Sequence, residues 1–210
     1  MRISAEHCLS MKSRMSRGKE IKRAMDFFGA AGLGILMALP AVAIAGLVWL
    51  TSPGPILIRQ RRLGKDGVSF TLYKFRTMRQ DAENGIPIWA RPNDPRCTAL
   101  GGLLRRTGLD EIPQLWNILR GDMSLVGPRP ERPEFAQAFT RSLPDFPLRH
   151  QVLPGLTGLA QIRGWRGDSS IAERLKSDLE YISNWSPSVD LWILMRTLRE
   201  SIRHFKNQKP

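Results

Sequence analysis

Two carboxylates that follow two arginines are the residues of this chain with the clearest chemical potential. The segment from Arg105 to Pro113 reads Arg-Arg-Thr-Gly-Leu-Asp-Glu-Ile-Pro and places Asp110 and Glu111 at the predicted start of a helix. Paired carboxylates hold Mg²⁺, arginine forks bind phosphoryl oxygens, and the free N–H groups at a helix start attract anions. Phosphoryl transfer needs these parts together, because a carboxylate that attacks a phosphate must overcome charge repulsion.

The same pair also has a purely structural explanation. Acidic residues are favoured at N-caps and in first turns, where they accept backbone hydrogen bonds and face the positive end of the helix dipole. Asp110 is the predicted N-cap of a helix over residues 112–120, with Pro113 in its first turn and Gly121 at its end. The pair alone therefore indicates no more than capping, and a catalytic interpretation depends on the surrounding residues.

Two predicted strands would position further cations. Residues 56–62 and 68–78 have strand-like patterns and are joined by a turn at residues 64–67, which indicates a β-hairpin. Alternation along the second strand puts Phe70, Leu72, Lys74 and Arg76 on one face. Lys74 and Arg76 would then project from the end of an apolar face, where they either bind phosphate or are simply solvated.

The remaining chain after the hairpin reads as loops and helices. A loop rich in Asn, Asp, Pro and Gly covers residues 80–98, and a second loop, with a possible short strand at residues 160–163, covers residues 154–164. Helices are predicted over residues 112–120, 133–142 and 189–205, and a further one to residue 183 starts at a Ser170 and Glu173 capping box. The last helix either packs on the core or lies at a bilayer surface, and its apolar side carries Leu191, Leu194, Leu198, Ile202 and Phe205.

An apolar segment precedes the hairpin. Residues 27–50 contain no charged side chain, and one straight helix of this length crosses a hydrocarbon core of about 30 Å. A cleaved secretory signal is disfavoured, because the run is too long and no small-x-small cleavage pattern follows it. Pro40 lies near the middle, where it removes a backbone hydrogen bond and favours a kink or a break.

Positive charge lies on both sides of this segment. Six Lys or Arg residues occur between positions 12 and 23, and four more between positions 59 and 65. Such clusters stay on the cytoplasmic side, which favours two half-helices hinged near Pro40 that enter and leave on the same side. A straight or kinked span is the alternative. The predicted organisation is a basic tail (1–23), a re-entrant membrane helix (24–52) and a cytoplasmic α+β, mostly helical catalytic domain (53–210).

Composition narrows the classes of partner. The chain has 210 residues and a formal charge of +13, which favours nucleic acids, anionic lipids or phosphorylated substrates. Cys8 and Cys97 fit no disulfide framework or zinc motif, and the three histidines are isolated from one another. Nucleic acid is disfavoured, because no DNA- or RNA-binding signature is present and much of the positive charge flanks the apolar segment.

Several motifs together resemble one family. They are Lys-Phe-Arg-Thr-Met (74–78), Asp-Pro-Arg (94–96), the run 104–117 with its Asp-Glu pair, Gly-Asp-Met-Ser-Leu-Val-Gly-Pro-Arg-Pro (121–130) and Pro-Gly-Leu-Thr-Gly (154–158). In order and spacing, the chain resembles the short form of the bacterial monotopic phosphoglycosyl transferases, which start lipid-linked glycan assembly. The likeness covers nearly everything from about residue 22 to residue 202.

The resemblance implies a two-step reaction in the bacterial inner (cytoplasmic) membrane, with the catalytic domain on the cytoplasmic face. Asp110 would attack the β-phosphate of a UDP-sugar, UMP would leave, and polyprenol (undecaprenyl) phosphate would take the phosphosugar. Glu111 would help to hold Mg²⁺ and assist proton transfer, and Arg105 would hold phosphate oxygens. The remaining implied substrate-binding and membrane residues are Arg106, Lys74, Arg76, Pro128, Arg129 and Pro130 for the substrates, and Pro40 for the membrane hinge. Some family members have Ser-Pro at the hinge, whereas this chain has Leu39-Pro40.

One rival interpretation from another class fits the same composition. A membrane-tethered module that binds phospholipid without turnover would also need an anchor and cations facing anionic headgroups. Such a module would tolerate Asp110→Asn, whereas an enzyme with an Asp110 nucleophile would not. The sequence leaves open which UDP-sugar is used, which polymer results and whether the protein forms a homo-oligomer.

Overall fold

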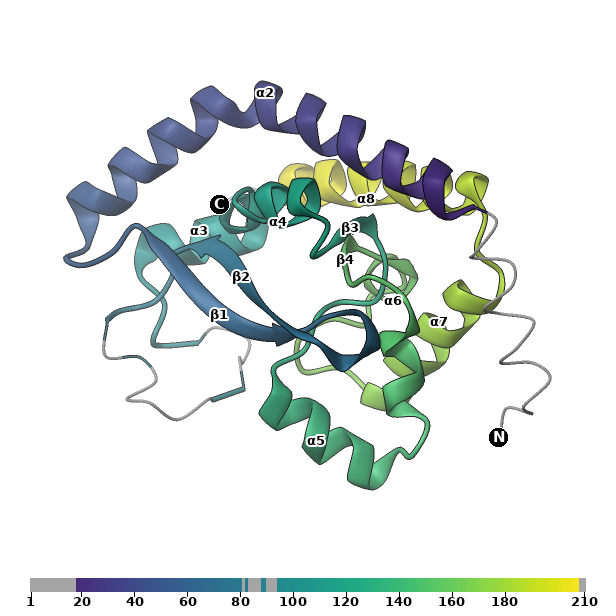
Figure 1. Cartoon of the computed structure of the whole chain (residues 1–210). Helices are drawn as coiled ribbons and strands as arrows, with labels where there is room; N and C mark the ends of the chain where they lie inside the picture. Colours follow the sequence, from purple (N-terminus) through teal and green to yellow (C-terminus); the bar gives the residue numbers. More distant parts are fainter. Residues whose placement is uncertain (1–17, 81, 83–87, 90–93, 208–210) are drawn as a thin grey trace.

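The computed structural model describes residues 18–80, 82, 88, 89 and 94–207, and helices dominate it (Figure 1). The predicted α+β, mostly helical fold class is confirmed. The long helix α2 (Lys19–Thr51) arches over the other elements, with α8 (Pro187–Asn207) behind it. Most of the basic tail and much of the predicted 80–98 loop lie outside the described residues.

Helix α2 begins at Lys19, inside the predicted basic tail, and contains 33 residues. By length and composition it is able to cross a membrane, and most of its apolar surface is not covered by the rest of the chain. The two predicted half-helices are joined into one arched helix that continues through Pro40. The missing N–H and the ring of Pro40 favour curvature of this kind.

The N-terminal end of α2 is fixed to the rest of the protein by two basic residues. Lys22 is buried, and its Nζ lies 2.7 Å from Asp190 of α8 and 3.0 Å from the carbonyl oxygen of Val126. Arg23 donates two hydrogen bonds of 2.6 Å to carbonyl oxygens in the last turn of α4 (Gln114–Arg120). Such bonds satisfy the free carbonyls at a helix end.

The C-terminal end of α2 packs on a separate apolar cluster. Ile44 and Val48 are buried there against Phe75 and Leu104. The middle of the helix is different, since Leu39 is 81% exposed. Helix α2 is therefore held at both ends, and its middle stands away from the two cores on which the ends rest.

The predicted hairpin is present. Strands β1 (Leu57–Leu63) and β2 (Ser69–Phe75) pair antiparallel, and a 3₁₀ turn at Lys65–Gly67 connects them. The fully buried Asn117 of α4 bonds the outer edge of β2, accepting from the Tyr73 amide at 3.1 Å and donating to the Thr71 carbonyl at 2.7 Å. These bonds fix α4 against the strand that carries Lys74.

The chain before Asp110 forms a helix that the sequence patterns did not predict. Helix α3 (Ala99–Thr107) starts at Thr98, whose side chain accepts a hydrogen bond from the Gly101 amide, and ends at Gly108 with φ 72°. A 3₁₀ turn (Leu109–Glu111) follows directly, so Asp110 lies inside this turn. The prediction of Asp110 as the N-cap of the next helix is wrong, because Pro113 holds the N-cap position of α4.

A close approach of two backbones explains Gly127 and Gly155 in the last two motifs. Strands β3 (Ser124–Val126) and β4 (Gly155–Thr157) pair in parallel, and a Cβ on Gly155 would lie 2.0 Å from the Gly127 amide nitrogen. Only glycine allows this approach. The predicted short strand at 160–163 is wrong, because the chain turns at Gly158 into the short helix α6 (Leu159–Ile162).

The other predicted helices are confirmed. Helix α5 spans Pro133–Ser142, and α7 (Ile171–Ser183) starts at the predicted Ser170 cap. A 3₁₀ helix at Phe146–Gln151 was not predicted. In the part of α8 whose side chains the structure describes, Ile193 is buried in the core, whereas Leu191 and Leu198 of the predicted apolar side are largely exposed. The exposed apolar side of α8 is the arrangement expected of a helix at a bilayer surface.

Candidate active site

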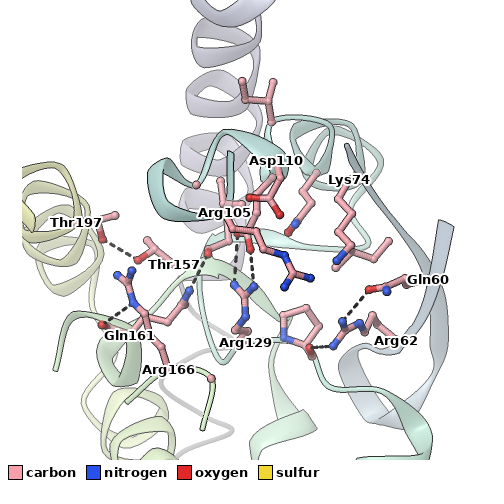
Figure 2. Close-up of a pocket in the computed structure, with 18 of the residues that line it drawn as sticks. Gln60, Arg62, Lys74, Arg105, Asp110, Arg129, Thr157, Gln161, Arg166 and Thr197 are labelled. Carbon is pink, nitrogen blue, oxygen red and sulfur yellow. Dashed lines mark hydrogen bonds and ion pairs between the residues drawn. The ribbon is translucent and has the colours of Figure 1, made fainter. Parts of the chain in front are cut away.

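A cavity of about 840 Å³ lies where these elements meet, and it contains the Asp-Glu pair. Figure 2 shows Asp110, Lys74, Arg105 and Arg129 turned toward it from four separate segments. Its lining comes from α2, the hairpin, the turn before α4, the segment after β3, and the region from β4 to α8. The cavity is large enough for a nucleotide-sized ligand.

Asp110 is a buried carboxylate, with 6% of its surface exposed. Burial, followed by the charge of the neighbouring Glu111, raises the pKa of Asp110 to about 6, against the opposing effect of Lys74. Among the described residues, no side chain or backbone group donates a hydrogen bond to it. A basic, unbonded carboxylate at a cavity wall is well suited to act as a nucleophile.

Glu111 has the opposite environment. Arg129 donates to both of its carboxylate oxygens, with Nη1 3.3 Å from one oxygen and Nη2 in close contact with the other. Burial opposes ionisation of Glu111, but the charge and hydrogen bond of Arg129, together with the charges of Lys74 and Arg166, lower the pKa of Glu111 overall. The two adjacent carboxylates are therefore distinct, because one is held by an arginine fork and the other is not.

The cations predicted near the pair are mostly in the cavity. Lys74, Arg105 and Arg106 all line it. Burial lowers the pKa of Lys74 to about 8, although Asp110 acts in the other direction. The Arg105 Nε donates to Thr77 Oγ1 at 2.9 Å, which fixes the direction of its side chain. Both arginines come from the last turn of α3, so the expected anion site is built from side chains and not from a helix start.

Some of the predicted site residues lie outside the cavity lining. Arg76 lies outside the cavity lining and donates to the Ser52 carbonyl oxygen just after α2, so it fixes the end of that helix. Pro128 also lies outside the lining, whereas Arg129 and Pro130 belong to it. Pro40 is exposed on α2, away from the carboxylates.

Several lining residues were not found from the sequence. Gln60 and Arg62 alternate along β1, and Arg62 donates to the Gln60 side chain at 2.8 Å and to the Pro130 carbonyl at 3.0 Å. Gln161 and Arg166 also line the cavity, and Arg166 Nε donates to the Gln161 carbonyl at 3.0 Å. Strand alternation was the signal for Arg62, but the wrongly predicted strand at 160–163 concealed Gln161.

Comparison with known proteins shows the family of this chain. The model of a family described as "Bacterial sugar transferase" matches residues 17–204. The chain belongs to the bacterial sugar transferase family. Within this family it is 42% identical over 182 residues to an Escherichia coli UDP-glucose:undecaprenyl-phosphate glucose-1-phosphate transferase, covering 85% of this chain but only 39% of that protein.

Shorter relatives match over most of their length. A putative undecaprenyl-phosphate N-acetylgalactosaminyl 1-phosphate transferase of Bacillus subtilis is 45% identical, with 68% of this chain and 80% of the relative covered. An exopolysaccharide production protein of Rhizobium leguminosarum is 40% identical, with 85% and 93% covered. The match thus includes short family members as well as longer ones.

The implied Mg²⁺ can be tested against the donor set of this family member. Asp110 and Glu111 are adjacent carboxylates whose mutual repulsion contributes to the raised pKa of Asp110, and a divalent cation relieves such repulsion. Among the residues that the structure describes, no group of three or more His, Cys, Asp or Glu side chains could hold a metal. Two carboxylates suffice for Mg²⁺ when substrate phosphates and water complete its coordination, so the residues fit.

Proposed function

We propose that this protein transfers a sugar 1-phosphate from a UDP-sugar to undecaprenyl phosphate and releases UMP. Family membership and the activities for which the relatives are named support the reaction class. The observation that carries the proposal is the pair of unlike carboxylates in a cation-lined cavity beneath an apolar helix. The relatives are named for glucose and for N-acetylgalactosamine, so both donors belong in the test.

The assignment of the nucleophile follows from the contacts of the two carboxylates. Both oxygens of Glu111 are engaged by Arg129, so an attack by Glu111 would first have to break that fork. Asp110 is adjacent, carries the higher pKa and has no such partner. Asp110 therefore attacks, and Glu111 with Arg129 provides a fixed charged group beside it.

The reaction proceeds in two displacements at one phosphorus atom. First, an Asp110 oxygen bonds to the β-phosphorus, and the bond from that phosphorus to the bridging oxygen breaks, so UMP leaves with the bond electrons. The sugar phosphate is then joined to Asp110 as an acyl phosphate, a mixed anhydride. Second, a phosphate oxygen of undecaprenyl phosphate bonds to the same phosphorus, the bond to Asp110 breaks, and undecaprenyl diphosphosugar forms with the carboxylate restored.

The cavity offsets the charge that these steps bring together. Lys74 and Arg105 line the cavity together with Asp110, and their positive charges offset the negative charge of the phosphoryl oxygens. Arg62 and Arg166 supply further positive charge around the cavity. Mg²⁺, held by Asp110 and Glu111 together with the diphosphate, would neutralise further charge on the donor.

Helix α2 would insert in the cytoplasmic membrane as a re-entrant arch. Both ends of α2 bind the same catalytic body, through Lys22 and Arg23 at one end and Ile44 and Val48 at the other. A straight span would carry one of these ends to the far side of the bilayer and break its contacts. The exposed apolar middle around Pro40 is the part that enters the lipid.

Product analysis tests the proposed reaction. Purified protein receives undecaprenyl phosphate, Mg²⁺ and either UDP-glucose or UDP-N-acetylgalactosamine, and nucleotide products are separated by chromatography. We expect UMP and a lipid diphosphosugar, with the reaction abolished by EDTA and by Asp110→Asn. Release of UDP would indicate a glycosyltransferase that acts at carbon. Lipid binding without any nucleotide release, and equal binding by Asp110→Asn, would support the phospholipid-binding module instead.

Labelling tests the topology. Single cysteines placed near residues 12 and 65 are exposed to an impermeant thiol reagent in sealed vesicles of known orientation. The re-entrant arrangement predicts that both react from the cytoplasmic face. Reaction from opposite faces would establish a span and contradict the proposal.

A further inference from the structure

The segment 128–131, which carries Arg129, is held at each of its four backbone carbonyls. The donors, in order along the segment, are the Gly155 amide at 2.9 Å, the Arg149 guanidinium at 2.9 Å, the Arg62 guanidinium at 3.0 Å and the Leu63 amide at 2.9 Å. Prolines at positions 128 and 130 fix two of the φ angles in the same segment. The segment therefore gives the Arg129 side chain a fixed base from which it binds Glu111.

Arg149 differs from the other donors because it is a charged side chain buried away from the cavity. It is 1% exposed, lies in the 3₁₀ helix Phe146–Gln151 and does not line the cavity. Its Nε and Nη2 lie 2.9 Å and 2.7 Å from an oxygen of Asp178 in α7, and Asp178 is 2% exposed. Two apolar side chains often serve a core as well as a buried ion pair does, so packing alone does not account for Arg149.

We propose that Arg149 is a positioning residue for the transfer reaction, which fixes the Arg129 carbonyl and thereby the guanidinium that binds Glu111. Asp178 in turn holds Arg149 in the orientation that this bond requires. This inference rests on the proposed function and adds a residue that acts on the site without touching a substrate. The carbonyl and the guanidinium belong to one residue, so a shift of the backbone moves the side chain. A misplacement of about 1 Å can cost about a hundredfold in rate.

The alternative is that Arg149 and Asp178 only stabilise the fold, and the test has to separate stability from rate. Arg149→Met alone would leave Asp178 as an unpaired buried charge, so the two are replaced together by Arg149→Met and Asp178→Val. This paired variant keeps an apolar contact but has no donor for the Arg129 carbonyl. Its matched control is Arg163→Met with Glu180→Gln, which removes another arginine–carboxylate pair that involves α7 and lies outside the cavity lining.

Two quantities are measured for each variant, the Tm in lipid nanodiscs and the kcat/KM for UMP release. We expect the paired variant to keep a Tm within a few degrees of the wild type and to lose kcat/KM about tenfold, whereas the control keeps both. In an Arg129→Ala background the same pair of substitutions should change kcat/KM by less than about twofold, since its effect passes through the side chain that is then absent. If the paired variant does not fold, Arg149→Lys replaces it in the same cycle, since lysine keeps a buried cation beside Asp178 but not the contact through two nitrogens.

Each outcome of the cycle has a distinct meaning. A wild-type kcat/KM in the folded paired variant would overturn the proposal, because the bond to the Arg129 carbonyl would then be dispensable. Equal fold losses in the wild-type and Arg129→Ala backgrounds would also overturn it, because the effect would then be one on the fold as a whole. If the wild type releases no UMP from either UDP-sugar, the proposed function itself fails, and this result is recognised before any variant is made.

Discussion

Replacement of Lys22 by methionine should loosen the N-terminal end of α2 and destabilise the whole protein. The Lys22 and Asp190 side chains are 8% and 3% exposed and lie 2.7 Å apart. Methionine keeps the volume of the lysine stem but leaves Asp190 as a buried charge without its cation. Removing one partner of a buried ion pair typically costs about 3–5 kcal/mol.

The remaining contacts of Asp190 determine where in that range the loss of stability in Lys22→Met should lie. Tyr181 donates to one of its oxygens at 2.7 Å, and Trp185 donates to the other at 3.2 Å. Since these neutral donors still stabilise the carboxylate, we expect a loss of unfolding free energy at the lower end of the range, about 3 kcal/mol. For a protein of this size that loss lowers the Tm by roughly 6–12 °C.

Thermal unfolding in lipid nanodiscs, followed by far-UV circular dichroism, measures this shift. Lys19→Met is the matched control, because Lys19 is an exposed cation one turn earlier in the same helix. In a double-mutant cycle, Asp190→Asn should rescue part of the loss in Lys22→Met, since the unpaired charge is then absent. Equal Tm values for Lys22→Met and Lys19→Met would refute the reasoning.

Three further predictions follow from the site and the helix. Arg129→Ala should lower kcat/KM about a hundredfold, because Glu111 then loses the guanidinium that binds both of its oxygens. Arg141→Ala, on the exposed side of α5, is the control and should leave kcat/KM unchanged. Steady-state UMP release measures both variants, and equal values would contradict the role given to Arg129. Pro40→Leu should straighten α2 and reduce turnover, so unchanged thiol labelling and activity would exclude Pro40 as the hinge. Burial, and then the charge of Arg149, lowers the pKa of His150 from 6.5 to about 4. Between these two pH values the unfolded chain binds one more proton than the folded protein, so the stability falls as the pH drops from 6.5 to about 4. His150→Phe should therefore lose less Tm than the wild type between about pH 7 and about pH 5, and an equal loss would contradict this.

The elements found from the sequence are those whose signals are local. The hairpin follows from strand alternation and a glycine turn, and α7 follows from the Ser170 cap. Helix α3 was missed because Gly101 and Gly102 weaken a helical pattern. The reason for Gly101 is tertiary, since a Cβ there would lie 1.9 Å from the Thr77 carbonyl oxygen.

Only part of the candidate site could be predicted from the sequence. Motifs indicated Asp110, Glu111 and Arg129, and the structure brings all three into one cavity. The pairing of Glu111 with Arg129 joins residues 18 positions apart, and no local pattern indicates it. Lys22 and Arg23 were interpreted as charges flanking a membrane segment, but both bind partners about a hundred or more positions away.

The central claim is that Asp110 carries the sugar phosphate between donor and acceptor. Incubating the protein with Mg²⁺ and its UDP-sugar in the absence of undecaprenyl phosphate should accumulate this acyl phosphate, and peptide mass spectrometry after rapid acid quenching locates it. The account predicts a sugar phosphate on Asp110, none on Glu111, and none in Asp110→Asn. An adduct on Glu111 or on another residue, or an unmodified Asp110 in protein that turns over when acceptor is added, would contradict it.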